Sequence, residues 1–250
     1  MLQLRVNIAF LTLLAPYLVI RRLLRLIVGT PKNYQILIQA GLASSLDFLE
    51  KLRVPEAPRV WMDVRTRLGF EKDAVDAMLQ VRGNLFLDVG ANVGYYSALL
   101  RRNFKSILAF EPHPETLRLL METIAVGKLR NVTALNQAVS DRDGFATLHI
   151  HSIGGRHSIA HPEGKEGLIV RTTTIDSLAT GSVDLVKVDV EGAEWQVVKG
   201  AERSVREGRI LRWIIEVHNK EVKSDFENYF RQRKYETRWL GDRHLFASLA

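Results

Sequence analysis

The sequence of 250 residues predicts an α/β fold, in which a mostly parallel sheet carries helices on both faces. A short apolar run over 84–89 passes through two glycines into a helical pattern, which is how a parallel-sheet unit begins. Further strand-like runs alternate with helical ones, as such a sheet requires. The last two runs, 235–240 and 244–248, flank a Gly-Asp turn and predict a closing antiparallel hairpin.

Three parts are expected: an apolar and basic helix over residues 1–30, a helical region over 31–82 and the sheet domain over 83–250. A chain of this length can bury a full core for one such domain with an appendage. Cysteine is absent, which excludes disulfides and thiolate metal sites and is compatible with a reducing compartment.

The basic charge is concentrated near the N-terminus. The formal net charge is +7, but residues 1–46 contain five basic residues and no acid, which leaves +2 for everything after them. An almost wholly apolar run of 15 residues before Arg21 includes Pro16, and a spanning helix needs roughly 20 residues. Because Arg21, Arg22 and Arg25 share one helical face, we expect this helix to lie on an anionic membrane surface; packing on the protein's own core or on a second subunit is the alternative.

The region over 31–82 is expected to contain helices and turns, with 33–52 the longest helix and 73–81 a short helix before the first strand. Prolines at 55 and 58 mark a break between them. No pattern of catalytic residues occurs here, so this region is expected to cover the sheet or to shape the substrate entrance.

The stretch 84–97 has the features of a ligand site. Asp88 ends the apolar run at the carboxyl end of the strand, where ligands bind in open α/β sheets, and Gly90 allows close approach to the backbone. Asn92 and Tyr95 stand where the dinucleotide fingerprint has its second and third glycines, so that motif fails. An acid before the first glycine faces a pyrophosphate poorly but suits a cationic ammonium and sulfonium.

The run Leu-Asp-Val-Gly-Ala-Asn-Val-Gly-Tyr-Tyr resembles motif I of class I S-adenosylmethionine (SAM) dependent methyltransferases, and the FkbM-type family in particular. The resemblance implies a Rossmann-like sheet with a final antiparallel strand. It also implies SAM as cofactor, with Asp88, Gly90, Asn92 and Gly94 as binding residues.

A second strand over 107–110 ends in Glu111, which lies 21 residues after Gly90. An acid at this place can accept hydrogen bonds from both ribose hydroxyls of a nucleoside, so Glu111 joins the expected cofactor site. His113 and Pro114 then begin a helix, and His113 is expected to cap that helix or to face solvent, with an adenine contact as the alternative.

A third strand is expected over 132–139, with Asn136 and Ala138 near its end where an adenine edge could be read. The runs 145–150 and 168–174 predict an inserted pair of strands. The glycine-rich loop between them and its flanks hold four histidines. These are expected to be surface residues, with contact to the substrate or to a metal as alternatives, and the histidines are His149, His151, His157 and His161.

The run Asp-Leu-Val-Lys-Val-Asp-Val-Glu-Gly-Ala-Glu-Trp from 184 is the second motif. Strand alternation places Lys187, Asp189 and Glu191 on one face and valines on the other, and charges on a buried strand need a partner or a function. The run resembles the second signature of the FkbM-type family. A fifth strand over 212–217 then leads to His218, and the resemblance covers about 85–218.

The resemblance implies an enzyme that transfers the methyl group of SAM to a hydroxyl oxygen of a sugar, a lipid-linked glycan or a small metabolite. The expected catalytic residues are Lys187, Asp189, Glu191 and His218, with Glu216 as a further candidate base. No metal is assigned, although carboxylates with His218 are competent ligands for a divalent ion.

The alternative is a non-catalytic SAM-fold module that docks to a membrane or to nucleic acid through its basic N-terminus. The acids of both motifs argue against it, because a module without cofactor has no need of them. Nucleic acid is not expected as a partner, since the chain after residue 46 has neither a strong basic excess nor an aromatic platform. We expect a cytoplasmic enzyme at the inner membrane face; the sequence leaves its oligomeric state open.

Overall fold

The computed structural model describes residues 71–150, 158–160 and 166–250, which belong to the compact unit Glu71–Ala250. The predicted N-terminal helix, the predicted helix over 33–52 and the histidines at 151, 157 and 161 lie outside the described residues. Within the described ranges, no helix has the length and apolar character needed to cross a bilayer.

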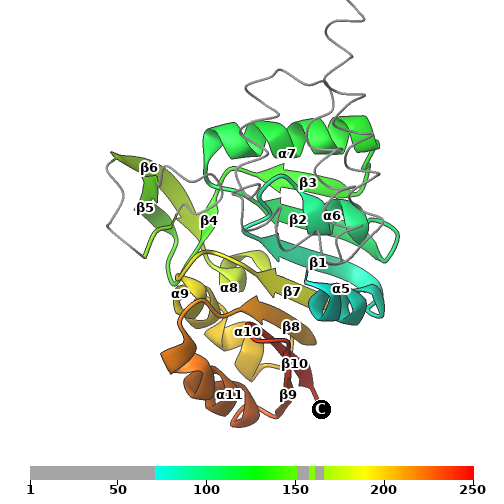
Figure 1. Cartoon of the computed structure of the whole chain (residues 1–250), viewed down its shortest axis with the longest axis vertical. Coiled ribbons are helices and arrows are strands. Elements are labelled where there is room, and N and C mark those ends of the chain that lie inside the picture. The colour runs from blue at the N-terminus through cyan, green and yellow to red at the C-terminus, as the bar shows by residue number, and fades with distance from the viewer. Residues whose placement is uncertain (1–70, 151–157, 161–165) are drawn as a thin grey trace, which may run out of the picture. The chain divides into compact units, whose positions relative to one another are not determined.

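Strands and helices alternate through most of the unit (Figure 1). The helices are α5 (Lys72–Leu79), α6 (Tyr95–Leu99), α7 (Pro114–Gly127), α8 (Ile175–Leu178), α9 (Glu194–Lys199), α10 (Glu202–Arg206), η2 (Lys220–Val222) and α11 (Lys223–Arg231). The strands are β1 (Gly83–Val89), β2 (Phe104–Phe110), β3 (Val132–Leu135), β4 (Ala138–Val139), β5 (Gly144–Ile150), β6 (Glu166–Thr173), β7 (Leu185–Val188), β8 (Arg212–Glu216), β9 (Tyr235–Leu240) and β10 (His244–Leu249).

The main sheet has the order β3-β2-β1-β7-β8-β10-β9. β1 pairs parallel with both β2 and β7, whereas β10 runs antiparallel to both β8 and β9. The predicted α/β fold with a terminal antiparallel hairpin is therefore confirmed. The strand order reverses direction between β1 and β7, and open α/β sheets bind ligands at the carboxyl ends of strands around such a point.

The two faces of the central strands differ in character. One face contributes valines and leucines to a large core, together with Trp213 and with side chains of the helices after β6. Typical members of this cluster are Leu87, Val186, Val188, Val197, Trp213, Phe226 and Phe230. The other face carries Asp88 and Lys187, which oppose each other in the β1–β7 register. α6 covers this face, since Ser97 bonds to Asp88 and the Lys187 ammonium lies over the Tyr96 ring.

The predicted third strand over 132–139 is wrong in its extent. The chain leaves the main sheet after Leu135, and Ala138–Val139 pairs with β6 instead. The Asn136 amide fixes this departure, because its Nδ2 donates to the carbonyls of Glu111 and Pro112. The inserted strand pair is confirmed: β5 and β6 are antiparallel and form with β4 a small sheet that projects on the left of Figure 1.

The residue after β4 packs closely against the end of α9, and Gly200 offers a test of this packing. A Cβ atom at Gly200 would lie 1.9 Å from the backbone oxygen of Ser140, which follows β4. We expect Gly200→Ala to lower the free energy of unfolding by about 1–3 kcal/mol, the usual cost of overpacking. Gly181→Ala is the control, because nothing lies within 4 Å of its added Cβ. Equal denaturation midpoints for both variants would contradict this packing.

Candidate functional site

A cleft opens at the carboxyl ends of β1, β2 and β7 and extends along β4. Predicted residues from both sequence motifs and from the strands between them line it, namely Gly90, Asn92, Glu111, Ala138, Asp189 and Glu191. Leu148 and Ile159 form part of its apolar wall, and Ile159 is held there because His149 and Ser158 exchange two backbone hydrogen bonds. The open space is about 60 Å³, and small-molecule sites usually hold roughly 300 Å³ or more, so ligand entry requires the walls to move apart.

The turn after β1 requires a glycine at its first position. Gly90 has φ +73°, and a Cβ there would lie 1.8 Å from the backbone oxygen of Asp189. Asn92 also has positive φ, at +52°, a conformation that asparagine tolerates better than most residues. Gly94 is different: it does not line the cleft, and a Cβ there would meet Leu120 of α7. Gly94 therefore serves helix packing in this structure.

Glu111 joins the two loops that border the cleft. Its carboxylate accepts hydrogen bonds from the backbone N–H of Asn92 at 3.1 Å and of His113 at 2.9 Å. Burial raises the pKa of Glu111 to about 7, against the lowering effect of these two hydrogen bonds. His113 begins α7 and its ring accepts from the Thr116 N–H, so the predicted capping role is confirmed.

Asp88 lies beneath the turn and does not line the cleft. Its side chain is fully buried, and Oδ2 accepts from the backbone N–H and the hydroxyl of Ser97 at 3.0 and 2.6 Å. Oδ1 has no hydrogen-bond partner among the described residues. Burial raises the pKa of Asp88, while nearby Lys187 lowers it. The sequence predicts a ligand contact here, whereas the structure shows Asp88 supporting the start of α6.

The second motif brings its predicted residues together. Lys187 is buried, and its ammonium donates to the Gly90 carbonyl at 3.3 Å and to Asp189 Oδ2 at 3.2 Å. Burial lowers the pKa of Lys187, but the carboxylates of Asp189, Asp88 and Glu71 outweigh that effect and raise it. Because β7 ends at Val188, Asp189 and Glu191 lie in the following turn and not on the strand.

His218, which follows β8, lies among carboxylates that follow β7. Its Nδ1 is 2.8 Å from Glu194 Oε1, and its Nε2 is 3.2 Å from Glu191 Oε2 and 3.9 Å from Asp189 Oδ1. Burial lowers the pKa of His218, but the hydrogen bond to Glu194 and the neighbouring carboxylates raise it to about 9. His218 is therefore an imidazolium at neutral pH.

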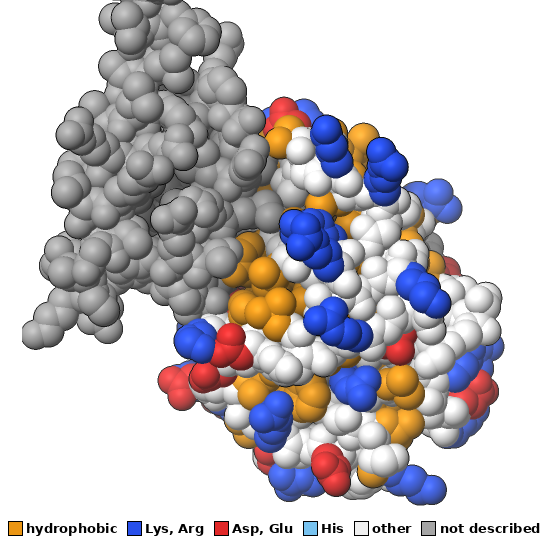
Figure 2. All heavy atoms as spheres, turned by 90° about the vertical axis from the view of Figure 1, so that its right-hand side faces the viewer, with side chains coloured by type: hydrophobic (Ala, Val, Ile, Leu, Met, Phe, Trp, Pro, Cys, Tyr) orange, Lys and Arg blue, Asp and Glu red, His pale blue; other side chains and the backbone are white. Residues whose placement is uncertain are grey.

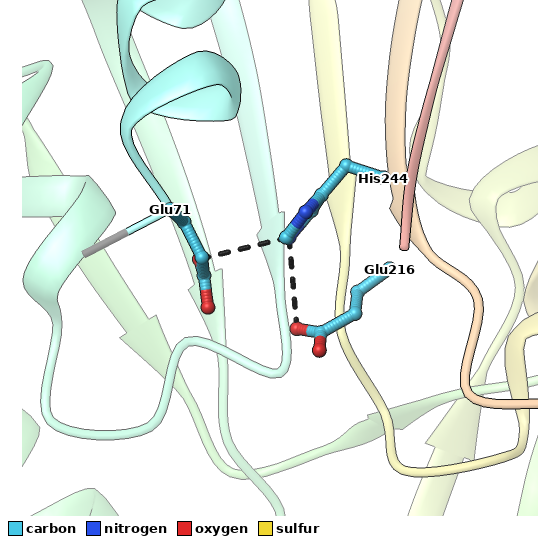
Figure 3. A group of neighbouring side chains, drawn as sticks. All are labelled: Glu71, Glu216 and His244. Carbon is cyan, nitrogen blue, oxygen red and sulfur yellow. Dashed lines mark ion pairs between the residues drawn. The ribbon is translucent and has the colours of Figure 1, made fainter. Parts of the chain in front are cut away.

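Glu216 connects this cluster to a second histidine. Its Oε1 is 3.7 Å from His218 Nε2, and its Oε2 is 3.7 Å from His244 Nε2. Glu71 approaches His244 from another side, with Oε2 3.6 Å from Nε2 (Figure 3). Burial lowers the pKa of His244 to about 4, so this imidazole is neutral where His218 is charged.

Two groups of side chains have donor atoms close enough to share a metal ion. They are Glu71, Glu216 and His244, and Asp189, Glu216 and His218, with all donor atoms of each group within 4.8 Å of one another. Carboxylate oxygens and imidazole nitrogens suit several divalent ions. The divalent-ion alternative for His218 therefore has a competent set of ligands.

Sequence reasoning missed Glu194, Glu71 and His244 as members of the cluster. Glu194 lies within the second motif, three residues after Glu191, so the signal was present. His244 opposes Glu216 in the β8–β10 register, which the predicted hairpin could have indicated once its strand was placed beside β8. Glu71 precedes the first described helix and has no such signal.

Comparison with known proteins gives a family match. The family model described as the methyltransferase FkbM domain matches residues 88–237. The hexuronic acid methyltransferase AglP of Haloferax volcanii is 28% identical over 181 residues, which are 68% of this chain and 71% of that protein. The methyltransferase sdnD of Sordaria araneosa is 29% identical over 155 residues, which are 46% of this chain and 60% of that protein.

A solved structure is also similar. The methyltransferase FkbM from Methylobacillus flagellatus has a TM-score of 0.49 and 16% identity, and the match covers 75% of this chain and 53% of that chain. The chain thus spans about half the length of that protein.

The raised pKa of His218 predicts that the protein loses stability at alkaline pH. The folded protein holds the proton to about pH 9, whereas an unfolded chain releases it near about pH 6.5. The stabilisation is therefore fully present below about pH 6.5 and is lost as the pH rises through about 9. Urea unfolding at both ends of this window should show a larger fall in free energy for the wild type than for His218→Gln.

His149→Gln is the control for that experiment, since His149 lies on β5 outside the carboxylate cluster. It should keep the wild-type dependence on pH. If the free energy of unfolding falls as much for His218→Gln as for the control, His218 is not responsible for the loss of stability at alkaline pH.

Proposed function

Because the chain belongs to the FkbM family of SAM-dependent methyltransferases, we propose that it transfers a methyl group to a hydroxyl oxygen of a sugar, a lipid-linked glycan or a small metabolite. One observation carries the proposal. One cleft is lined both by Glu111 and by Asp189 and Glu191. Asp189 pairs with Lys187, and Glu191 pairs with His218.

The residues of the cleft fit SAM. Gly90 and Glu111 both line the cleft, and the Glu111 carboxylate can accept hydrogen bonds from ribose hydroxyls. The apolar wall, which includes Val139, Leu148 and Ile159, suits an adenine ring. When bound, SAM supplies a methyl carbon that is already activated by a positively charged sulfur.

The chain's own contribution is to hold the acceptor hydroxyl and to remove its proton. Aligning two reactants can supply about 7–11 kcal/mol of the barrier, and a general base typically adds roughly 10²- to 10⁴-fold. Lys187 and His218 carry protons at neutral pH and cannot act as the base. We therefore assign proton removal to Asp189 or Glu191, with Lys187 and His218 holding these carboxylates in place.

The sugar hydroxyl is favoured as acceptor by the relative from Haloferax volcanii, whose name assigns it a hexuronic acid substrate. The cluster at the cleft is strongly polar, as recognition of a many-hydroxyl acceptor requires. Charged side chains and a protonated imidazole can accept from and donate to such hydroxyls.

The cofactor assignment is tested at Glu111. Glu111→Gln keeps the side-chain size but removes the negative charge, so SAM affinity measured by calorimetry should fall at least about tenfold. In the wild type the affinity should rise as the pH passes through about 7, because only the ionised carboxylate accepts both hydroxyls.

Glu115→Gln is the matched control, since Glu115 is exposed in the first turn of α7. It should bind SAM as the wild type does. Unchanged affinity in Glu111→Gln would refute this cofactor site.

The catalytic assignment is tested at Asp189. Asp189→Asn should lower turnover by roughly 10²- to 10⁴-fold while SAM affinity is largely kept, measured with labelled SAM and uronic-acid-containing glycans. Glu207→Gln is the control, because Glu207 pairs with Arg209 and does not line the cleft. Normal turnover in Asp189→Asn would overturn the role.

Chelator treatment distinguishes the metal alternative in the same assay. Full activity after exhaustive treatment with EDTA would exclude a required divalent ion at the Asp189, Glu216 and His218 group. Loss of activity that added Mg²⁺ or Mn²⁺ restores would replace the acid–base assignment by a metal-assisted one.

A further inference from the structure

We propose that a second pocket, lined by three arginines and remote from the cleft, binds a phosphate-bearing anion. The arginines are Arg82, Arg212 and Arg238. The pocket's volume is about 380 Å³, and its other lining residues are Ala77, Gln80, Val81 and Phe246. We refer to it as the arginine pocket.

The arginine pocket lies toward the amino ends of the parallel strands. Arg82 directly precedes β1, and Arg212 is the first residue of β8. The cleft of the candidate active site is at the carboxyl ends of the same strands. No residue lines both, so the arginine pocket is a separate site.

The antiparallel hairpin explains why arginines from distant segments meet. In the sheet register Arg212 opposes Ser248 and Arg238 opposes Phe246. Phe246 and Ser248 are two residues apart on β10, so all four side chains leave the same face of the sheet. The end of α5 contributes Ala77 and Gln80 above this face, and the Arg238 guanidinium lies 4.8 Å from the centre of the Phe246 ring.

The positive charges of the arginine pocket are not neutralised by the described part of the protein. None of the three arginines forms an ion pair with an acidic side chain of residues 71–150, 158–160 or 166–250. Acids near this end of the sheet have other partners: Asp184 accepts from two backbone N–H groups, and Glu207 pairs with Arg209. Glu236 opposes Ser248 on the same face, which leaves an excess of positive charge.

This charge and geometry select a phosphate over a simple carboxylate. A guanidinium presents two parallel N–H donors to phosphate oxygens and keeps its charge at any accessible pH. Three of them match the multiple charge of a phosphate or diphosphate better than the single charge of a carboxylate. The volume of about 380 Å³ leaves room beside the phosphate for the group that carries it.

The surroundings of the arginine pocket are basic as well. α5, which borders it, lies on the right-hand side of Figure 1. Figure 2 shows that side of the molecule, with Lys and Arg side chains spread over it and fewer acids among them. The phosphate could therefore belong to an anionic lipid headgroup or to a free phosphorylated compound. Both sources share the chemistry proposed here.

The experiment uses the full chain, with pyrophosphate as the probe in calorimetry. Wild-type protein should bind pyrophosphate, and the double variant Arg212→Gln/Arg238→Gln should lose at least about tenfold in affinity. Arg142→Gln is the control. Arg142 lies in the turn before β5 and does not line the arginine pocket, so this variant should bind pyrophosphate as the wild type does. Absence of pyrophosphate binding, or equal affinity in the double variant, would overturn the proposal.

The variants must also be folded, because Arg212 is only half-exposed. Because the arginines do not line the cleft, unchanged SAM affinity in the double variant would show that it is folded. If the double variant is unfolded, the exposed Arg82→Gln takes its place and should weaken pyrophosphate binding at least about threefold; unchanged affinity there would refute the site.

Sedimentation with vesicles separates the two sources of phosphate. Binding to phosphatidylglycerol vesicles that is weakened in the double variant but kept in Arg142→Gln would support the site and assign it to lipid headgroups. Pyrophosphate binding with vesicle binding that is equal in all variants would support it for a free phosphorylated compound. If a short RNA binds through these arginines and pyrophosphate does not compete, the phosphate pocket is wrong and this face is a nucleic-acid surface.

Discussion

The buried charge of Lys187 organises the centre of the molecule. An ammonium in a protein interior is stable only with nearby negative charge and hydrogen-bond acceptors, and Lys187 finds Asp88 opposite it, Asp189 after it and the Gly90 carbonyl beside it. These contacts join the turn after β1 to the turn after β7. Replacing Lys187 by a neutral residue would remove the cation that faces the buried Asp88 carboxylate and would break the contact between the turns after β1 and β7.

Local sequence patterns predict most of the fold, because each element is determined by nearby residues. The apolar run before Asp88, the helix start at Pro114 and the valine alternation around Lys187 all correspond to observed elements. The third strand was predicted too long, since strand propensity continues through 132–139. The strand ends because of a tertiary contact, in which the Asn136 amide donates to the carbonyls of the two residues after β2. Strand propensity is a local property and does not reveal such a contact.

The candidate site was predictable where its residues lie within a motif and not where they come from separate segments. Lys187, Asp189 and Glu191 are close in sequence, and His218 follows the next strand in the sheet. His244 lies near them only because β10 pairs with β8. The arginine pocket depends on the same pairing, since it is lined by residues of both strands. Such sites become visible once the register is known, since register decides which side chains share a face.

The position of β10 also bears on how the chain acquires its structure during synthesis. β10 follows β9 in the sequence but lies between β8 and β9 in the sheet. Until residues 241–249 have been synthesised, β9 lacks β10, the strand with which it pairs. Glu216 likewise lacks His244, the residue opposite it on β10. β9 therefore joins the main sheet only through β10, and the acidic cluster gains His244 only when β10 has paired with β8.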